Sequence, residues 1–356
     1  MAELILTVLP ESWEKEEADH ASPEFLLISN LDRNLGILSE RMRKIPFYSA
    51  FLSNSIRQEL IGLGRFKGRG LHFTETFLQE EDLDQTMMEE MELFNRDFQV
   101  ARSLISLSGK LNLDDLIGLN KSLGGKGSLI RTSEKYLGGK SRETAEVLAS
   151  SPDQVKPLLA GLEVYLENRG QVHPLIHLSG FVYQYLNILP FESKNMISME
   201  LAVQALIQQE YGRNLPFLPI AFGFNLGMTP FFVNLKKAQS KEELSDWNLF
   251  FLETLNQGLD LILSQTKTWE KQAEADLKII EEMGTLGKVP KKLLPLVYEN
   301  PLFYSAVMSL EDKVASKPTM YRAIRSMEKK GILEEITKVA RNKTYVSRPI
   351  LKLFER

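Results

Sequence analysis

Apolar residues recur at helical spacing through most of the chain. Between residues 24 and 288 they fall mainly three or four positions apart, which places them on one face of successive helices. The first helix has its apolar face at Leu27, Leu31, Leu35, Leu38 and Met42. Pro46 interrupts this pattern, and a glycine-rich turn at 62–70 ends the next helix. The pattern predicts a mostly α fold.

Helix-start and helix-stop residues bound the elements in the middle of the chain. Proline in the first turn and glycine just beyond the last turn are typical of helix ends. They predict helices at 152–167, 174–188 and 195–211. Three more are predicted at 229–239, 245–263 and 267–283. The last of these is polar over most of its surface, which is typical of a connection between domains.

Two segments depart from this helical pattern. Residues 123–148 contain five glycines and predict irregular chain with one small β-hairpin near 145–150. From Val289 onward the sequence predicts three short helices followed by a two-stranded ribbon, with Ser316 as N-cap of the third helix and Gly331 closing it. That order of elements is typical of a winged helix-turn-helix, whose third helix enters the major groove of DNA.

Basic and polar residues occupy the DNA-contacting positions of this C-terminal module. On the third helix they are Lys317, Thr319, Tyr321, Arg322 and Arg325, and on the ribbon Arg341 and Lys343. Ala323, Ile324 and Met327 are expected to face the module's own core. A second interpretation stays open: the module is a protein-interaction or dimerisation unit whose basic face is solvated.

Composition narrows the class of protein. The 356 residues suffice for two or three domains, and the absence of cysteine excludes disulfides, thiolate catalysis and Cys–zinc sites. The N-terminus lacks a basic region, and no apolar run approaches the ~18 residues of a membrane span, so we expect a cytoplasmic protein without a signal peptide. The net charge of −4 divides into +6 for residues 311–356 and −10 for the remainder, so the C-terminal end is suited to an anionic partner.

We therefore predict four regions. They are an N-terminal helical region (1–100), a core (101–265), a linker helix (266–288) and the winged helix-turn-helix (289–356).

Four segments carry a family resemblance. GSLIRTSEKYLGG (127–139), AEVLASSPDQV (145–155), HPLIHLSGFVYQYLNILPF (173–191) and DWNLFFLETL (246–255) occur in this order. They resemble the stretch before the flap, the flap with the helix after it, the helix that delivers the signature loop, and a late core helix of the Fic-domain family. Members of that family typically transfer AMP from ATP to a hydroxyl side chain. The resemblance implies a helical Fic-like core with a small β-hairpin flap.

The signature loop departs from the family pattern, His-Pro-Phe-x-(Asp/Glu)-Gly-Asn-Gly-Arg-x-x-Arg. The matching positions run from Leu189 to Glu200, and Pro190, Phe191 and Asn195 are kept, which implies that they shape the loop. The replaced groups are the general base (Leu189), the Mg²⁺-holding acid (Ser193), the two glycines (Lys194 and Met196) and the two arginines (Ile197 and Glu200). Leucine transfers no proton, and neither isoleucine nor glutamate neutralises phosphate. We therefore expect no appreciable AMP transfer by the usual route, and no cofactor.

An upstream segment, SAFLSNSIRQEL (49–60), resembles the family's inhibitory helix. In one register Ser53 and Ile56 match, and Arg57 occupies the position of the inhibitory glutamate. That register suggests a charge-swapped pair between Arg57 and Glu200. A second register places Glu59 at the acidic position, and the sequence leaves both open.

Neighbouring groups keep a catalytic alternative open. Glu192 lies one residue before the acidic position, and Lys194 is suited to hold a phosphate as a point charge. The alternative is an adenylyltransferase with relocated groups that uses ATP and Mg²⁺. The other interpretation is that Glu192 and Ser193 cap the helix beginning at Asn195, with Lys194 solvated.

Other residues are candidates for binding a ligand or a metal ion. Possible ligand-binding residues are Arg131, Ser133, Lys194 and Asn195. Arg131 has a second interpretation, in which it hydrogen-bonds the flap backbone. His173 and His177 are four residues apart but have no third ligand nearby, so no metal site is expected.

The leading hypothesis is a catalytically degenerate Fic-like regulator. Its core senses a ligand or partner, and its C-terminal module binds DNA. A scaffold or homodimer without either activity is the third possibility.

Overall fold

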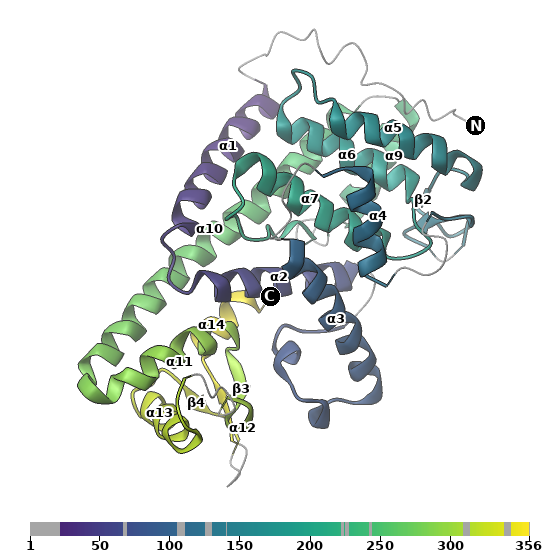
Figure 1. Cartoon of the computed structure of the whole chain (residues 1–356). Coiled ribbons are helices and arrows are strands. Elements are labelled where there is room, and N and C mark those ends of the chain that lie inside the picture. The colour runs from purple at the N-terminus through teal and green to yellow at the C-terminus, as the bar shows by residue number, and fades with distance from the viewer. Residues whose placement is uncertain are drawn as a thin grey trace. The chain divides into compact units, whose positions relative to one another are not determined.

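The computed structural model describes residues 22–66, 70–104, 111–124, 130–139, 141–221, 224, 228–241, 244–308, 314–337 and 343–355. Helices dominate, as the apolar spacing predicts (Figure 1). The α-helices are α1 (Pro23–Met42), α2 (Tyr48–Phe66), α3 (Gln85–Leu104), α4 (Leu113–Ser122), α5 (Val155–Glu167), α6 (Pro174–Ile188), α7 (Asn195–Tyr211), α9 (Met228–Lys241), α10 (Ser245–Glu282), α11 (Lys288–Glu299), α12 (Ser305–Met308), α13 (Lys317–Lys329) and α14 (Arg348–Phe354). Short 3₁₀ turns lie at Thr74–Phe77, Glu80–Asp82, Pro152–Gln154 and Gly284–Gly287.

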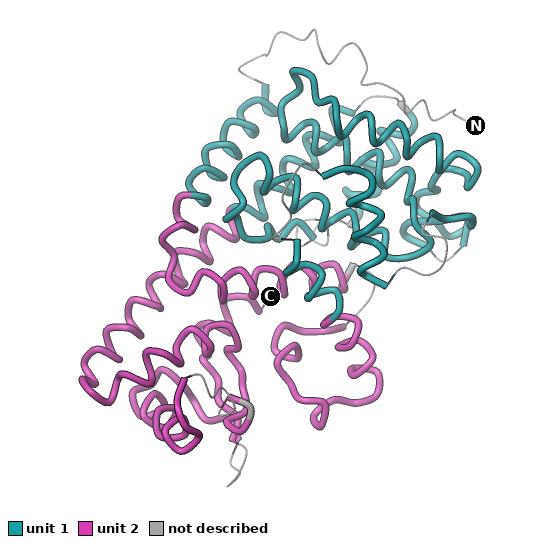
Figure 2. Tube along the Cα trace, viewed as in Figure 1, with its two compact units in different colours: residues 1–39, 96–259 teal, residues 40–95, 260–356 magenta. Residues whose placement is uncertain are grey.

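The chain forms two compact units, each assembled from separate stretches of sequence (Figure 2). Unit 1 contains residues 1–39 and 96–259, and unit 2 contains residues 40–95 and 260–356. Within the described residues, no helix is both long and apolar enough to span a bilayer.

Unit 1 is built around the pair α6 and α7. These helices pack against each other, α5 covers α6, and α4 packs on α7. Twelve residues of each of the two central helices are buried, which explains why neither shows a strong polar face in the sequence. Pro174 begins α6 at the predicted position, because proline in the first turn is a local signal. α7 also begins at the predicted Asn195.

The predicted hairpin consists of two short antiparallel strands in unit 1. β1 (Tyr136–Leu137) pairs with β2 (Val147–Leu148), with Tyr136 opposite Leu148. The turn between them requires glycine, because a Cβ at Gly139 would lie 2.3 Å from the carbonyl oxygen of Thr144. The second strand lies where the sequence placed the hairpin, and its partner lies ten residues upstream.

Unit 2 contains the C-terminal elements and α2. Its sheet has the order β3–β5–β4, with β3 (Leu302–Tyr304), β4 (Glu334–Glu335) and β5 (Thr344–Val346), all antiparallel. The predicted ribbon is β4 and β5. The third strand and α14 were not predicted. Asn300 and Pro301 end α11 early, and the freed Leu302–Tyr304 pairs with β5.

The prediction of two separate helices between residues 245 and 283 was wrong. The segments 245–263 and 267–283 form the single helix α10 rather than two. The intervening Ser264, Gln265 and Thr266 include neither glycine nor proline, so nothing in the backbone stops the helix. Gln265 and Thr266 are buried, which adds packing where the sequence suggested a break.

Candidate functional site: the loop between α6 and α7

The signature-like loop begins and ends in left-handed backbone conformations. Leu189 caps α6 with φ 42°, and Lys194 caps α7 with φ 66°. Residues with a side chain adopt this conformation rarely, and they keep it only where the surroundings fix it. The loop is therefore held by specific contacts from outside its own backbone.

One set of contacts comes from Asn195. Its Oδ1 accepts a hydrogen bond from the backbone N–H of Phe191 (2.9 Å), and its Nδ2 donates to the carbonyl of Phe191 (2.7 Å). The Phe191 ring is fully buried, and its backbone forms an isolated β-bridge with Ile130. Asn195 and Phe191 thus close the turn into α7 and anchor it in the core.

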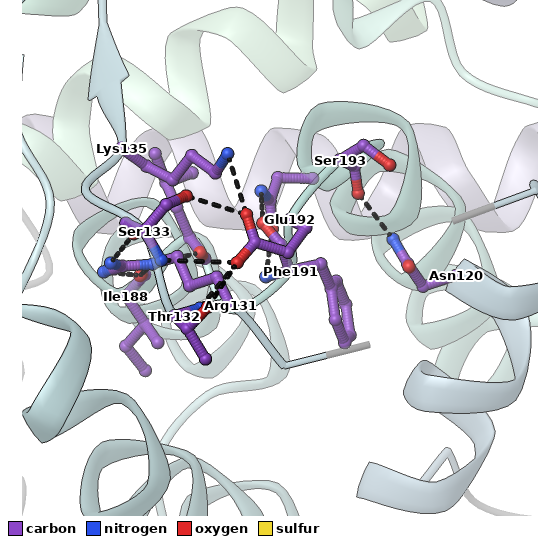
Figure 3. A network of polar contacts seen from close by, with 11 residues as sticks. Asn120, Arg131, Thr132, Ser133, Lys135, Ile188, Phe191, Glu192 and Ser193 are labelled. Carbon is purple, nitrogen blue, oxygen red and sulfur yellow. Dashed lines mark hydrogen bonds and ion pairs between the residues drawn. The ribbon is translucent and has the colours of Figure 1, made fainter. Parts of the chain in front are cut away.

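The second set comes from Arg131, which is only 1% exposed. Its Nε donates to the carbonyl of Leu189 (2.8 Å), and Nη2 donates to the carbonyls of Ile188 (2.9 Å) and Ser150. Nη1 donates to the carbonyl of Ser133 (2.8 Å). Figure 3 shows Arg131 beside Ile188 and Ser133, with dashed lines marking its hydrogen bonds.

Burial lowers the pKa of the Arg131 guanidinium, and the charges of Glu192 and Glu134 oppose this shift. Since its donors are used by protein oxygens, the geometry favours the structural interpretation of Arg131 over ligand binding.

Glu192 points away from α7, toward the segment before β1 (Figure 3). Its carboxylate accepts hydrogen bonds from the backbone N–H of Thr132 (2.6 Å) and the hydroxyl of Ser133 (2.7 Å), and Lys135 Nζ lies 3.2 Å away. The backbone N–H of Thr132 and the Ser133 hydroxyl, helped by Lys135, lower the pKa of Glu192 to about 2. The capping interpretation of Glu192 was wrong, because α7 has Lys194 as its N-cap and no side-chain cap.

Ser193 and Lys194 are held by side chains of two other helices, α3 and α4. Asn120 Nδ2 donates to the carbonyl of Ser193 and to the hydroxyl of Ser198, both at 2.9 Å. Lys194 Nζ lies 2.9 and 3.0 Å from the two carboxylate oxygens of Asp97. The side chains of Lys194 and Asp97 are 12% and 9% exposed, so the expectation of a solvated Lys194 was wrong.

The remaining signature positions are buried. Leu189, Ile197 and Glu200 are all in the interior, where the family resemblance implies a base and two arginines. Gln204 Nε2 donates to the carboxylate of Glu200 (2.7 Å). Leu189 and Ile197 therefore pack in the interior, and the buried Glu200 is hydrogen-bonded by Gln204.

The inhibitory-helix-like segment lies on α2, in unit 2. Ser53 and Ile56 are buried there, and the Arg57 guanidinium lies over the Phe77 ring, 4.7 Å from its centroid. Glu200 belongs to unit 1, so the pairing of Arg57 with Glu200 stays a prediction.

The two histidines of α6 have protein partners. His173 Nε2 lies 3.0 Å from Asp32 Oδ2, and His177 Nε2 lies 2.8 Å from the carbonyl of Tyr165. Among the residues that the structure describes, no group of three His, Cys, Asp or Glu side chains could hold a metal ion.

The DNA-contact candidates lie mainly on α13. Lys317, Arg322 and Arg325 are exposed, Thr319 and Tyr321 are half-buried, and Lys343 lies on the ribbon in an ion pair with Glu335. Arg341 lies outside the described residues. As expected, Ala323, Ile324 and Met327 are buried.

Sequence reasoning missed the residues that hold the loop from a distance. Asp97 lies 97 residues before Lys194, and Asn120 lies 73 residues before Ser193. Thr132 and Lys135 lie close to the candidate Ser133 in the segment 127–139. This closeness was the only signal in the sequence that could have pointed to them as contacts of the loop.

Comparison with known proteins gives a fold. No protein-family model matches the sequence, and no curated protein matches it. Among solved structures, the chain is similar to a Fic family protein from Desulfovibrio desulfuricans G20, with TM-score 0.50 and 17% identity over 92% of this chain and 96% of that one. It is also similar to a Fic domain containing signaling protein from Bacteroides thetaiotaomicron VPI-5482, with TM-score 0.50 and 14% identity over 68% and 97%. The protein has a mostly α, Fic-like fold.

Replacing Arg131 by lysine tests whether the guanidinium holds the loop. Lysine keeps the charge but cannot reach the carbonyls on both sides, so buried acceptors lose their donors. We expect Arg131→Lys to lower the free energy of unfolding by about 2–4 kcal/mol in chemical denaturation. The exposed Arg142→Lys is the control, with a change within about 0.5 kcal/mol. Equal stability of the two variants would contradict this role.

The pH dependence of stability tests Glu192. Its pKa is about 2 in the folded protein against 4.5 ordinarily, so its contribution is complete above pH 4.5 and is lost as the pH falls toward 2. The stability difference between wild type and Glu192→Gln should therefore shrink from pH 5 to pH 3. Glu253→Gln, an exposed change on α10, provides the control. A difference that does not vary with pH would rule out this assignment.

Proposed function

We propose that the protein is a Fic-like regulator that does not transfer AMP by the usual route and that binds DNA through its C-terminal module. The proposal that AMP is not transferred by the usual route is supported by the loop between α6 and α7. A leucine, 2% exposed, stands where the family resemblance implies the general base, and Lys194 and Met196 stand where it implies glycines. A side chain at either position competes with the close approach of phosphate to the backbone.

The contacts of Glu192 and Lys194 speak against relocated chemistry. A carboxylate with a pKa of about 2 is a weak base at neutral pH. Lys194 is paired with Asp97 at 2.9 Å, so the positive charge available to a phosphate is largely neutralised.

ATP binding distinguishes the regulator from an adenylyltransferase. We expect calorimetric titration with ATP and Mg²⁺, and then with AMP, to give no saturable heat and no shift in melting temperature. The reason is that the candidate phosphate ligands are neutralised, buried or absent. Asp97→Asn, which frees Lys194, serves as a comparison in which weak nucleotide binding appears. Magnesium-dependent transfer of label from ATP to protein by the wild type would instead support the alternative enzyme.

The DNA-binding half rests on one observation, the division of α13 into two faces. Its apolar residues are buried, while Lys317, Arg325 and Lys329 have no carboxylate partner in the described part of the chain. The order α11, β3, α12, α13, β4, β5 supports a winged helix-turn-helix, in which this helix enters the major groove. Unpaired cations on such a helix suit a phosphate backbone.

The ribbon contributes less in this proposal. Lys343 is paired with Glu335, and the ribbon's Glu334 is held by Arg348, at the start of α14, through two of its nitrogens. A cation already held by a carboxylate releases fewer counterions when it meets a phosphate. We therefore assign the main contact to α13.

The salt dependence of DNA binding tests this assignment. We expect wild type to bind mixed-sequence duplex DNA in fluorescence anisotropy, with an affinity that falls steeply between about 50 and 200 mM salt. Arg322→Ala and Arg325→Ala should each reduce the salt slope by about 1. Lys278→Ala, an exposed change on α10, is the matched control and should leave the slope unchanged. Equal slopes in all four proteins would favour the scaffold or dimer, which sedimentation would then detect.

A further inference from the structure

Unit 1 contains a cavity that is separate from the signature-like loop. Its volume is about 350 Å³, and the residues that line it come from the end of α5, the start of α6 and the end of α7. The loop joins the opposite ends of α6 and α7, which lie about 25 Å away along a helix of seventeen residues. The volume is within the range of small-molecule sites.

One wall of the cavity is apolar. It is formed by Leu166, Leu175, Leu178, Leu206 and Ile207. Three helices contribute these side chains, so the wall is held by the core packing of the unit. Such a surface takes the hydrocarbon part of a ligand.

His177 gives the cavity a hydrogen-bond acceptor. The residue is 8% exposed and lines the cavity, and its ring stacks on Tyr165 with centroids 4.3 Å apart. Its Nε2 lies 2.8 Å from the carbonyl of Tyr165, and a carbonyl only accepts, so Nε2 carries the proton. Nδ1 is then a lone-pair acceptor, and it has no hydrogen bond in the described part of the chain. Burial lowers the pKa of His177, which keeps the ring neutral at physiological pH.

The rim of the cavity has one carboxylate that is not in an ion pair within the described part of the chain. Glu210 and Arg169 both line it and form an ion pair at 2.8 Å, so their charges largely cancel. Glu167 also lines it, is exposed, and has no ion pair among the described residues. A second carboxylate lies just outside the lining: Asp32 accepts a hydrogen bond from the hydroxyl of the lining Tyr211 (2.8 Å) and lies 3.0 Å from His173 Nε2. The charge at the rim therefore favours a cation.

We propose that this cavity binds a small amphipathic amine. Its hydrocarbon part lies against the leucine wall, its N–H donates to His177 Nδ1, and its positive charge is attracted by Glu167. The proposed binding site is argued from the volume and the lining residues of the cavity alone. The further step, that this amine is the ligand sensed by the core, rests on the proposed regulatory function.

Binding of a matched pair of probes tests the site. Phenethylamine and phenylacetate share an aromatic ring and differ in the sign of their charge. We expect ligand-observed NMR to show saturable binding of phenethylamine by the wild type and at least tenfold weaker binding of phenylacetate. Absence of saturable phenethylamine binding, or equal affinity for the two probes, would overturn the proposal.

Variants locate the binding. Leu206→Trp fills the cavity and should abolish phenethylamine binding. Glu167→Gln, an exposed change that the fold tolerates, should weaken it about three- to fivefold, as expected for one exposed charge pair. Glu163→Gln, on the same helix but outside the lining, should leave the affinity unchanged. Affinities that are the same in wild type, Leu206→Trp and Glu167→Gln would place the probe elsewhere and refute the site.

A DNA titration separates this inference from the proposed function. If phenethylamine binds and changes the affinity for duplex DNA, both stand. If it binds without changing the DNA affinity, the site stands and the sensing role is wrong. If DNA is bound but phenethylamine is not, the site is wrong and the DNA-binding role is unaffected.

Discussion

The loop between α6 and α7 depends on one buried charge. Arg131 donates to carbonyls at the end of α6, to Ser133 and to Ser150, and its own backbone N–H donates to the carbonyl of Pro190 (2.9 Å). A buried guanidinium is costly unless its donors are paired. Here one side chain donates to backbone oxygens of three segments: the end of α6, Ser133 and Ser150. Opening the loop would leave both the charge and these oxygens unpaired, so Arg131 ties the loop to the residues on either side of the β-hairpin.

This arrangement separates the shape of the loop from its chemistry. The groups that fix the shape are Arg131, Phe191 and Asn195, and none of them needs the reactive residues that the family resemblance implies. Lys194 carries a cost: a residue with a side chain adopts the left-handed conformation that suits glycine, at about 1–3 kcal/mol. Its ion pair with Asp97, in a largely buried position, offsets part of that strain.

The sequence predicted what local signals determine. The start of α6 was predicted to the residue, because a proline in the first turn acts within that turn. The hairpin and the three-helix order of the C-terminal module were predicted from turn residues and apolar spacing. Contacts that join distant segments were not. Glu192 meets Thr132 across 60 residues, and no periodic pattern specifies such a pairing. β3 was missed for the same reason, since its partner β5 lies some forty residues further on.

Unit 2 joins the inhibitory-helix-like segment and the proposed DNA-binding module in one core. Asn54 on α2 donates to the carbonyl of Tyr298 (2.8 Å), and the Tyr298 hydroxyl donates to the buried Asp276 on α10 (2.6 Å). The ring of Tyr298 also meets Trp269 edge-on, with centroids 4.8 Å apart. α11, which carries Tyr298, packs on both α2 and α13. Close-packed interiors transmit displacement rather than absorb it. Within unit 2, α11 therefore joins the inhibitory-helix-like segment on α2 directly to α13, the helix that carries the proposed DNA contacts.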